Sequence, residues 1–265
     1  MRAAFLSLSL LLVACSGKSD AEDTSDTGGA GDDGGAGDGG GTGDGGGGTG
    51  DDGGGSTTEP DWPTGDPAGC DLTGAAFNLD FFEARVLAPA GIGSLLVDPL
   101  GKNLSVGFTA QTETTADAYL AFMESGAQDP CTPTVAAPTG TWTDPVFEVG
   151  PADIQTEIDG NPVVLSSFQL AAATSADCSA LVDGVFIADL DARENAALLG
   201  GLIGSEDPAE ICDALLGFGA ACVPCAADSE PYCLNIVVDQ IPAAAVETAV
   251  VPRSAEDVAA DEGCG

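Results

Sequence analysis

The sequence predicts a mainly β fold: an antiparallel sandwich or barrel that carries a short helical, disulfide-tied segment near its C-terminus and follows a disordered tether. Three observations support this prediction. Short segments that alternate apolar with polar residues recur along the second part of the chain, eight cysteines are spread over residues 70–264, and residues 16–66 contain almost no large apolar side chains. A succession of short strands with few helices favours a sandwich or barrel over βαβ units.

The strands are predicted from the period of their apolar residues. Residues 77–81 and 104–109 place apolar side chains at every second position, as half-buried antiparallel strands do. Asp159-Gly160-Asn161 predicts a hairpin turn, because glycine accepts the positive φ that tight turns require. Further strands are expected at 118–123, 146–149, 154–158, 162–170, 185–190 and 234–241.

Helices are expected in few places, all near the C-terminus. Residues 207–210, Asp-Pro-Ala-Glu, provide an N-cap, a proline at the first helical position and a glutamate that reciprocates the cap. Ile211, Leu215 and Phe218 then fall on one face until Gly219 ends the helix. Two other helical segments are expected, at 194–203 and from Ser254 onward.

The N-terminus has the pattern of an export signal. Arg2 is followed by twelve apolar or small residues, from Ala3 to Ala14. A positive charge, a short apolar run and small residues before a cut are typical of secretory signals. The run is too short for a bilayer span, which needs roughly 20 residues. We therefore expect residues 1–14 to act as a signal peptide.

Leu12-Val13-Ala14-Cys15 resembles the lipobox of bacterial lipoproteins. The resemblance implies that the signal is cut just before Cys15 and that Cys15 carries a thioether-linked diacylglycerol and an N-acyl chain. Several acyl chains anchor a protein durably, because each buried methylene contributes roughly 0.8 kcal/mol. In such lipoproteins an aspartate after the cysteine favours the inner membrane. Ser16 takes that place here, so the resemblance implies the outer membrane of the cell envelope.

Residues 15–66 read as the lipidated cysteine and a flexible linker. Residues 16–66 contain 20 glycines and 13 acidic residues against one basic residue, Lys18. Such a segment has nothing to bury and is expected to be disordered. Residues 28–33 and 47–52 match the first six positions of a calcium-binding β-roll repeat. However, Gly35 and Gly54 stand where that repeat needs a large apolar residue, so we expect a tether and not a calcium roll.

Residues 67–265 are long enough for one domain with a sizeable core. Their charge is strongly negative, with 30 acidic residues against Arg85, Lys102, Arg193 and Arg253. Nucleic acids and anionic headgroups both require a basic footprint, so no nucleic-acid partner is expected. The acidic surface keeps a tethered protein soluble. Attraction to divalent cations or to a basic partner stays open, and the sequence identifies no protein or small-molecule ligand.

The domain contains an even number of cysteines, which in an exported chain predicts a disulfide framework. Eight cysteines allow 105 pairings, and the sequence does not choose among them. Bridges near the domain ends would fasten the termini, and the four cysteines of residues 212–233 lie close enough to form a local knot. The candidates are Cys70, Cys131, Cys178, Cys212, Cys222, Cys225, Cys233 and Cys264.

Cys222-Val223-Pro224-Cys225 has three interpretations. The first is a thioredoxin-like redox pair, but the stretch before Pro231 is too short for the helix that lowers a thiol pKa. The second is a zinc site, but the spacing C-x9-C-x2-C-x7-C fits no common zinc ribbon. We favour the third, structural disulfides, with redox and metal chemistry kept as alternatives.

The chain contains no histidine, which excludes Ser-His-Asp triads, Cys-His dyads and His-ligated zinc sites. A glycosidase-like pair of facing carboxylates stays open in principle. Its candidates are Asp80, Glu83, Glu148, Asp189 and Asp191. With 30 acidic residues some proximity arises by chance, so we expect no catalytic residue, no metal ligand and no cofactor.

The anchor, the Gly/Asp-rich tether and the cysteine-containing block 212–233 together resemble envelope lipoproteins of Gram-negative bacteria. The resemblance covers the layout of most of the chain but the residues of only that last block, and it transfers no site. The sequence therefore favours a non-catalytic binding or structural module, attached to the membrane through Cys15. The alternative is an exported enzyme, either a carboxylate-based hydrolase or a thiol–disulfide oxidoreductase that uses Cys222 and Cys225.

Overall fold

The structure, a computed structural model, describes residues 59–89, 91, 93, 104–124, 126–158 and 161–264. Several sequence predictions fall on residues outside these ranges. They concern Cys15, the two glycine-rich matches at 28–33 and 47–52, and the turn residues Asp159 and Gly160.

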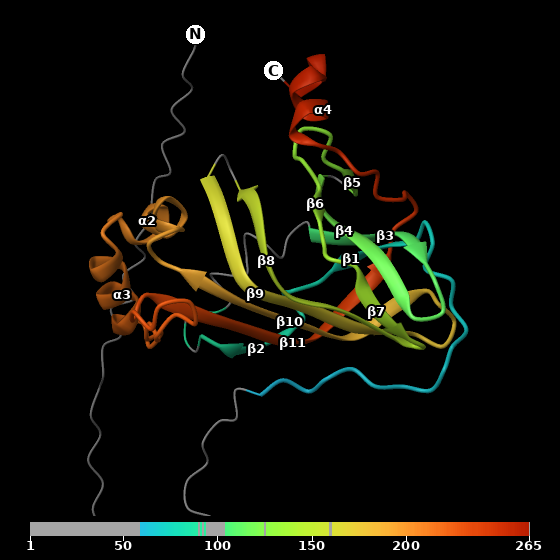
Figure 1. Ribbon diagram of the computed structural model, residues 1–265, viewed down its shortest axis with the longest axis horizontal. Helices are drawn as coiled ribbons and strands as arrows, with labels where there is room; N and C mark the ends of the chain where they lie inside the picture. The colour runs from blue at the N-terminus through green and yellow to red at the C-terminus, as the bar shows by residue number, and fades with distance from the viewer. Residues whose placement is uncertain are drawn as a thin grey trace, which may run out of the picture. The chain divides into compact units, whose positions relative to one another are not determined.

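An antiparallel sheet closes on itself into an eight-stranded barrel (Figure 1). β11 closes it by pairing with β10 along one edge and with β1 along the other, where Phe77 lies opposite Ala245. The mainly β prediction is confirmed, as the barrel. Around the barrel the strands are β1 (Ala76–Leu79), β3 (Leu104–Gln111), β4 (Thr115–Glu124), β7 (Gly140–Thr143), β8 (Val146–Ile158), β9 (Asn161–Thr174), β10 (Ala180–Asp191) and β11 (Cys233–Ala245).

Three short strands extend this sheet. β2 (Arg85–Ala88) pairs with β11, and β5 (Ala127–Gln128) and β6 (Val135–Ala136) pair with β4. The sequence does not predict these strands or β7, because each has two to four residues and none alternates apolar with polar residues over a longer run. The pattern of apolar residues also predicts two strands, 146–149 and 154–158, where the structure has the single strand β8. The pairing register shifts between the two segments while the strand continues, so the division is wrong.

The barrel interior is filled by aromatic side chains. Phe77, Phe108 and Phe147 form consecutive edge-to-face contacts, with ring centroids 6.2 and 4.8 Å apart. Phe186 contacts Phe81 and Phe168 in the same way, at 5.5 and 5.6 Å. All are buried. Those on strands point inward because alternate residues of a strand face the same side, and Phe81 lies just after β1. These rings occupy space that a ligand-binding barrel leaves open.

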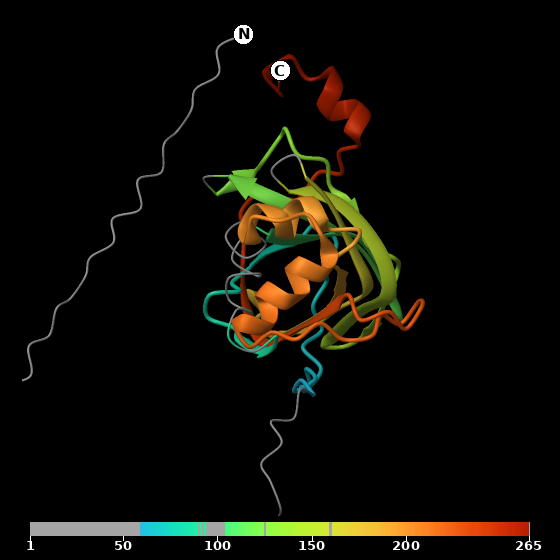
Figure 2. The ribbon, with the colours of Figure 1, turned by 90° about the vertical axis from the view of Figure 1, so that its left-hand side faces the viewer.

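Two helices cover one end of the barrel, α2 (Ala196–Ile203) and α3 (Pro208–Gly217) (Figure 2). Leu199, Ile211 and Leu215 are buried in the same apolar cluster as the strand residues. α3 begins as predicted, with the Asp207 carboxylate accepting hydrogen bonds from the backbone N–H groups of Ala209 and Glu210.

Two details of the α3 prediction are wrong. Glu210 does not reciprocate the cap, because its carboxylate accepts a hydrogen bond from the Ser205 hydroxyl at 2.6 Å. Phe218 does not share the buried face of Ile211 and Leu215. It follows the last helical residue, Gly217, and its side chain is 61% exposed.

The C-terminal segment crosses the outer wall of the barrel before α4 (Ala255–Ala260) and the 3-10 turn Glu262–Cys264. The Val250 side chain packs against Gly107 of β3, where a Cβ atom would lie 2.3 Å from it. Glycine is therefore required at position 107 for this close approach. Ser254 caps α4 in a reciprocal arrangement with Asp257, which confirms the helix expected from Ser254.

Candidate functional site

All eight cysteines of residues 70–264 form disulfides in the structure. Cys70 bonds to Cys178 and Cys131 to Cys264, so each end of the folded region is fastened to a distant part of the chain. The other two bridges are local. They join Cys212 to Cys222 and Cys225 to Cys233.

Cys222 and Cys225 therefore belong to different bridges. Exchange chemistry of a Cys-x-Pro-Cys pair needs the two sulfurs to bond to each other in the oxidised form. Here Cys222 is tied to α3 through Cys212, while Cys225 is tied to the first residue of β11, Cys233. The two bridges therefore hold the 218–232 loop against α3 and β11.

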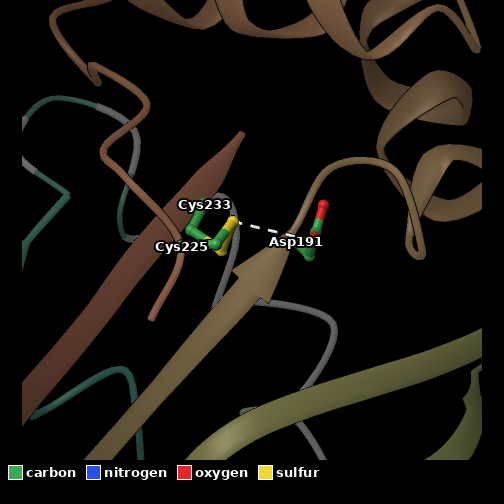
Figure 3. Close-up of side chains that lie close together, drawn as sticks. All are labelled: Asp191, Cys225 and Cys233. Atoms are coloured by element: carbon green, nitrogen blue, oxygen red, sulfur yellow. Dashed lines mark hydrogen bonds between the residues drawn. A yellow bond between two sulfur atoms is a disulfide. The ribbon is translucent and has the colours of Figure 1, made fainter. Parts of the chain in front are cut away.

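The Cys225–Cys233 bridge lies beside Asp191, at the end of β10 (Figure 3). The Cys225 Sγ atom is 3.6 Å from Asp191 Oδ2. A disulfide sulfur carries no hydrogen, so this is a van der Waals contact and not a donated hydrogen bond. Three potential metal ligands thus lie together, but both thiols are consumed by the disulfide.

The third potential ligand is held by a cation. Arg193 Nε donates to Asp191 Oδ1 at 2.9 Å, and Arg193 Nη1 donates to Asp228 at 2.7 Å. The guanidinium carbon also lies 5.2 Å from the ring centroid of Tyr232, within cation–π range. The hydrogen bonds from Arg193 keep the pKa of Asp191 below its usual value. This corner joins β10 to the 218–232 loop and offers no free ligand for a metal.

The five candidate carboxylates do not converge on one cleft. The Asp80 backbone N–H bonds to Pro242 of β11, whereas Asp189 lies opposite Asn235 of the same strand. Seven residues of an extended strand span roughly 23 Å, far beyond the separation of glycosidase carboxylates. Asp80 itself caps the turn that contains Glu83, by accepting from the backbone N–H groups of residues 82 and 83.

The remaining candidates lie on β8 and β10. Glu148 is exposed and pairs with Thr141 and Ala171 on the neighbouring strands. Asp189 is half-buried, and burial raises its pKa, with a hydrogen bond from Ser167 acting in the opposite direction. Asp189 and Asp191 share a face of β10, but Arg193 holds the second carboxylate. No paired acid and base results among these five residues.

A charged cluster joins the start of the described chain to the barrel wall. Arg85 Nε and Nη2 donate to the two carboxylate oxygens of Asp239, at 2.8 and 2.6 Å. Arg85 also donates to Asp61, whose backbone N–H bonds to Asp239 at 3.0 Å. Asp239 is fully buried. The sequence predicts a domain over residues 67–265, and the contacts of Asp61 precede that boundary.

A surface slot lies between β6 and the C-terminal part of β8. β7 pairs with β8 through Thr141 and Thr143, but among the described strands no ladder joins β6 to β8. A cavity of about 220 Å³ lies there, lined by Pro133, Thr134, Val135, Gln155, Thr156 and Glu157.

An apolar space of about 20 Å³ adjoins this slot and shares Val135 and Thr156 with it. Its other lining residues are Leu104, Leu120, Phe122, Ile154, Leu165 and Phe186. No sequence signal marks the slot, because it depends on which strands separate in the folded sheet.

Among the residues that the structure describes, no helix has the length and apolar character needed to cross a membrane. Comparisons of the chain with protein-family models, with curated proteins and with solved structures give no match, so the function is argued from the residues of this chain.

Proposed function

We propose that this protein is an exported envelope lipoprotein, anchored by lipid on Cys15, in which a flexible acidic linker carries a disulfide-fastened barrel. The proposed barrel acts as a non-catalytic binding or structural module at the outer membrane. Residues 1–14 are the signal peptide and residues 15–66 the lipidated cysteine and linker.

One observation carries the proposal. The chain has nine cysteines, and the eight between residues 70 and 264 pair among themselves. Four disulfides are typical of an oxidising compartment, which a chain reaches by export. The ninth cysteine is Cys15, at the end of the apolar run where the lipobox resemblance puts the acyl chains. The paired set leaves no cysteine over for Cys15 to bond within the chain.

The non-catalytic role is supported by what the candidate residues already do. Asp191 is engaged by Arg193, Asp80 caps a turn, and Cys222 and Cys225 are held in separate bridges. Three of the four arginine and lysine residues of the domain are in ion pairs with aspartates. With 30 acidic residues in the same domain, this pairing supports the proposal that the partner is not a nucleic acid.

Metabolic labelling tests the anchor. The full chain is expressed in a Gram-negative host with labelled palmitate, next to the Cys15→Ser variant. The wild-type protein is expected to incorporate label and to appear in the outer-membrane fraction of the lysed cells, whereas Cys15→Ser should do neither. Cys212→Ser is the matched control, because it removes a disulfide cysteine and leaves the lipobox intact. Equal labelling of wild type and Cys15→Ser would overturn the proposal.

A further inference from the structure

The slot between β6 and β8 exposes main-chain hydrogen-bonding groups on its β8 wall. On β8, Gln155 lies opposite Val164 of β9, and the N–H and C=O of Val164 both bond to the Asn195 side chain. In an antiparallel ladder, opposed residues either bond to each other or both point away. The N–H and C=O of Gln155 therefore point away from β9 and into the slot, and two residues on, Glu157 does the same.

The β6 wall follows from the same rule. The Ala137 N–H donates to the carbonyl of Ala118 on β4, so the N–H and C=O of its neighbour Ala136 point away from β4. Two residues earlier, the Thr134 N–H already bonds to the Arg253 carbonyl. Ala136, Gln155 and Glu157 are all exposed. The β8 edge therefore presents available amide groups to the cavity, whereas on the β6 side the lining residue Thr134 already bonds to the C-terminal segment and Ala136 lies outside the lining.

The other side of the same hairpin shows how this kind of opening is filled. β8 and β9 continue as a pair beyond their ladders with the neighbouring strands (Figure 1): β9 pairs with β10 only from Ser166 on, and within the described residues no ladder joins β8 to β6. On the β10 side, the fully buried Asn195 side chain bonds to Val164, accepting its N–H at 2.9 Å and donating to its C=O at 3.0 Å. An amide group therefore completes one edge of the hairpin, while the opposite edge faces the slot.

The charge around the slot selects the kind of amide ligand. The exposed Glu157 carboxylate lines it. Arg85 and Arg193 are paired with aspartates on other elements. Arg253 borders the slot through its main chain at Thr134, and its guanidinium is paired with Asp261. The domain keeps a large excess of negative charge, which attracts a cationic partner and repels an anionic one.

We propose that the slot binds a short, extended, lysine- or arginine-bearing peptide, whose main chain bonds to the β8 edge at Gln155 and Glu157. Val135, at the mouth of the small apolar space, packs against one apolar side chain of the peptide, and Glu157 pairs with the cation. The cavity is below the roughly 300 Å³ of a typical drug-sized pocket, which fits a short stretch of main chain better than a bulky ligand. This inference goes beyond the proposed anchoring and does not require lipid on Cys15.

Fluorescence anisotropy with the purified full chain tests the proposal. The probe is a labelled five-residue peptide of alternating lysine and valine, acetylated and amidated at its ends. Saturable one-to-one binding is expected, and the glutamate–valine peptide should not compete. Two competitors carry N-methyl groups on either the lysine or the valine nitrogens, which are the two edges of an extended peptide. One of them should compete about tenfold more weakly than the other, because it lacks the N–H groups that face β8.

Variants of the slot distinguish edge binding from general attraction to an acidic protein. Gln155→Pro removes the N–H that faces the slot without breaking a β8–β9 ladder bond, as Pro162 already does on β9. It should weaken binding about tenfold. Glu157→Gln should weaken binding about threefold, the size of one exposed ion pair, whereas Glu148→Gln, elsewhere on β8, should have no effect.

If Gln155→Pro lowers the melting temperature, Val135→Trp, which fills the cavity from the β6 wall, makes the same test. The proposal is overturned if no probe binds, if both methylated peptides compete equally, or if Glu148→Gln weakens binding as much as Glu157→Gln. Because the Cys15→Ser chain should bind the probe like wild type, failure here and failure of lipid labelling are separate results.

Discussion

Arg85 and Asp239 form a two-bond ion pair on the barrel wall, with Nε and Nη2 of the guanidinium on the two oxygens of a fully buried carboxylate. Arg85 belongs to the short strand β2, and Asp239 to β11, the strand that closes the barrel. The pair therefore holds β2 to the sheet, and through Asp61 it also holds the start of the folded chain.

Arg85→Ala should destabilise the domain clearly, because it leaves the Asp239 carboxylate buried without its cation. Asp61→Ala is the matched control, since Asp61 is 74% exposed and exposed ion pairs contribute little. Urea denaturation at neutral pH is expected to give a lower midpoint for Arg85→Ala than for Asp61→Ala. Equal midpoints for the two variants would show that the buried pair is not the stabilising contact.

The same pair predicts a pH dependence of stability. Hydrogen bonds from Arg85 hold the pKa of Asp239 below its usual value, against the effect of burial. A carboxylate with a lowered folded pKa contributes stability that is fully present above its unfolded pKa of about 3.9 and is lost as the pH falls through the folded value. The stability difference between wild type and Asp239→Asn should therefore be constant from about pH 7 to pH 5 and shrink towards pH 2. A difference that grows on acidification would contradict this account.

Asn195→Ala should cost about 2 kcal/mol or more. The buried amide bonds to the N–H and C=O of Val164, and its loss leaves both groups without that partner, whereas the Asp191 carbonyl keeps the backbone N–H of residue 195. Asn235→Ala, on the exposed face of β11, is the control and should stay within about 0.5 kcal/mol of wild type. Chemical denaturation of both variants measures the difference. Equal stabilities would contradict the idea that the Asn195 side chain completes the hydrogen bonding of the β9 edge.

The long-range disulfides should contribute more stability than the local ones. Cys70 and Cys178 are 108 residues apart, and Cys212 and Cys222 only 10. By the chain-entropy relation, replacing the first pair with serines should cost about 4 to 5 kcal/mol and the second about 3 kcal/mol. Guanidinium unfolding tests the order.

Peptide mapping without reductant should find the four observed disulfides, and an insulin reduction assay should show no exchange activity. A disulfide-linked Cys222–Cys225 peptide, together with exchange activity, would favour the oxidoreductase alternative.

The tether is expected to remain disordered with or without calcium. Residues 28–33 and 47–52 match the start of a calcium-roll repeat, but Gly35 and Gly54 replace the apolar residues that would form its core. Circular dichroism of a peptide that spans residues 16–66 should stay coil-like in millimolar calcium. A β signal that grows with added calcium would show that the two matches bind the ion.

Local patterns in the sequence predict much of the barrel. Alternating residues such as Leu104, Val106 and Phe108 indicate a strand with one buried face, and Asp207 and Pro208 indicate where α3 begins, because both signals depend on neighbours along the chain. An even set of cysteines behind an export signal likewise indicates disulfides. These inferences need no knowledge of which segments meet.

By itself, then, the sequence determines the β class, the disulfide framework without its connectivity, and the absence of histidine chemistry. Only the tertiary structure decides that the sheet closes into a barrel, that Cys222 bonds to Cys212 and not to Cys225, and that β8 leaves β6 to open a slot. The physical reason is that closure, pairing and slot all depend on contacts between residues far apart in the sequence or on a choice among equally near partners. The period of apolar residues along one segment contains no information about these long-range contacts or about that choice of partner.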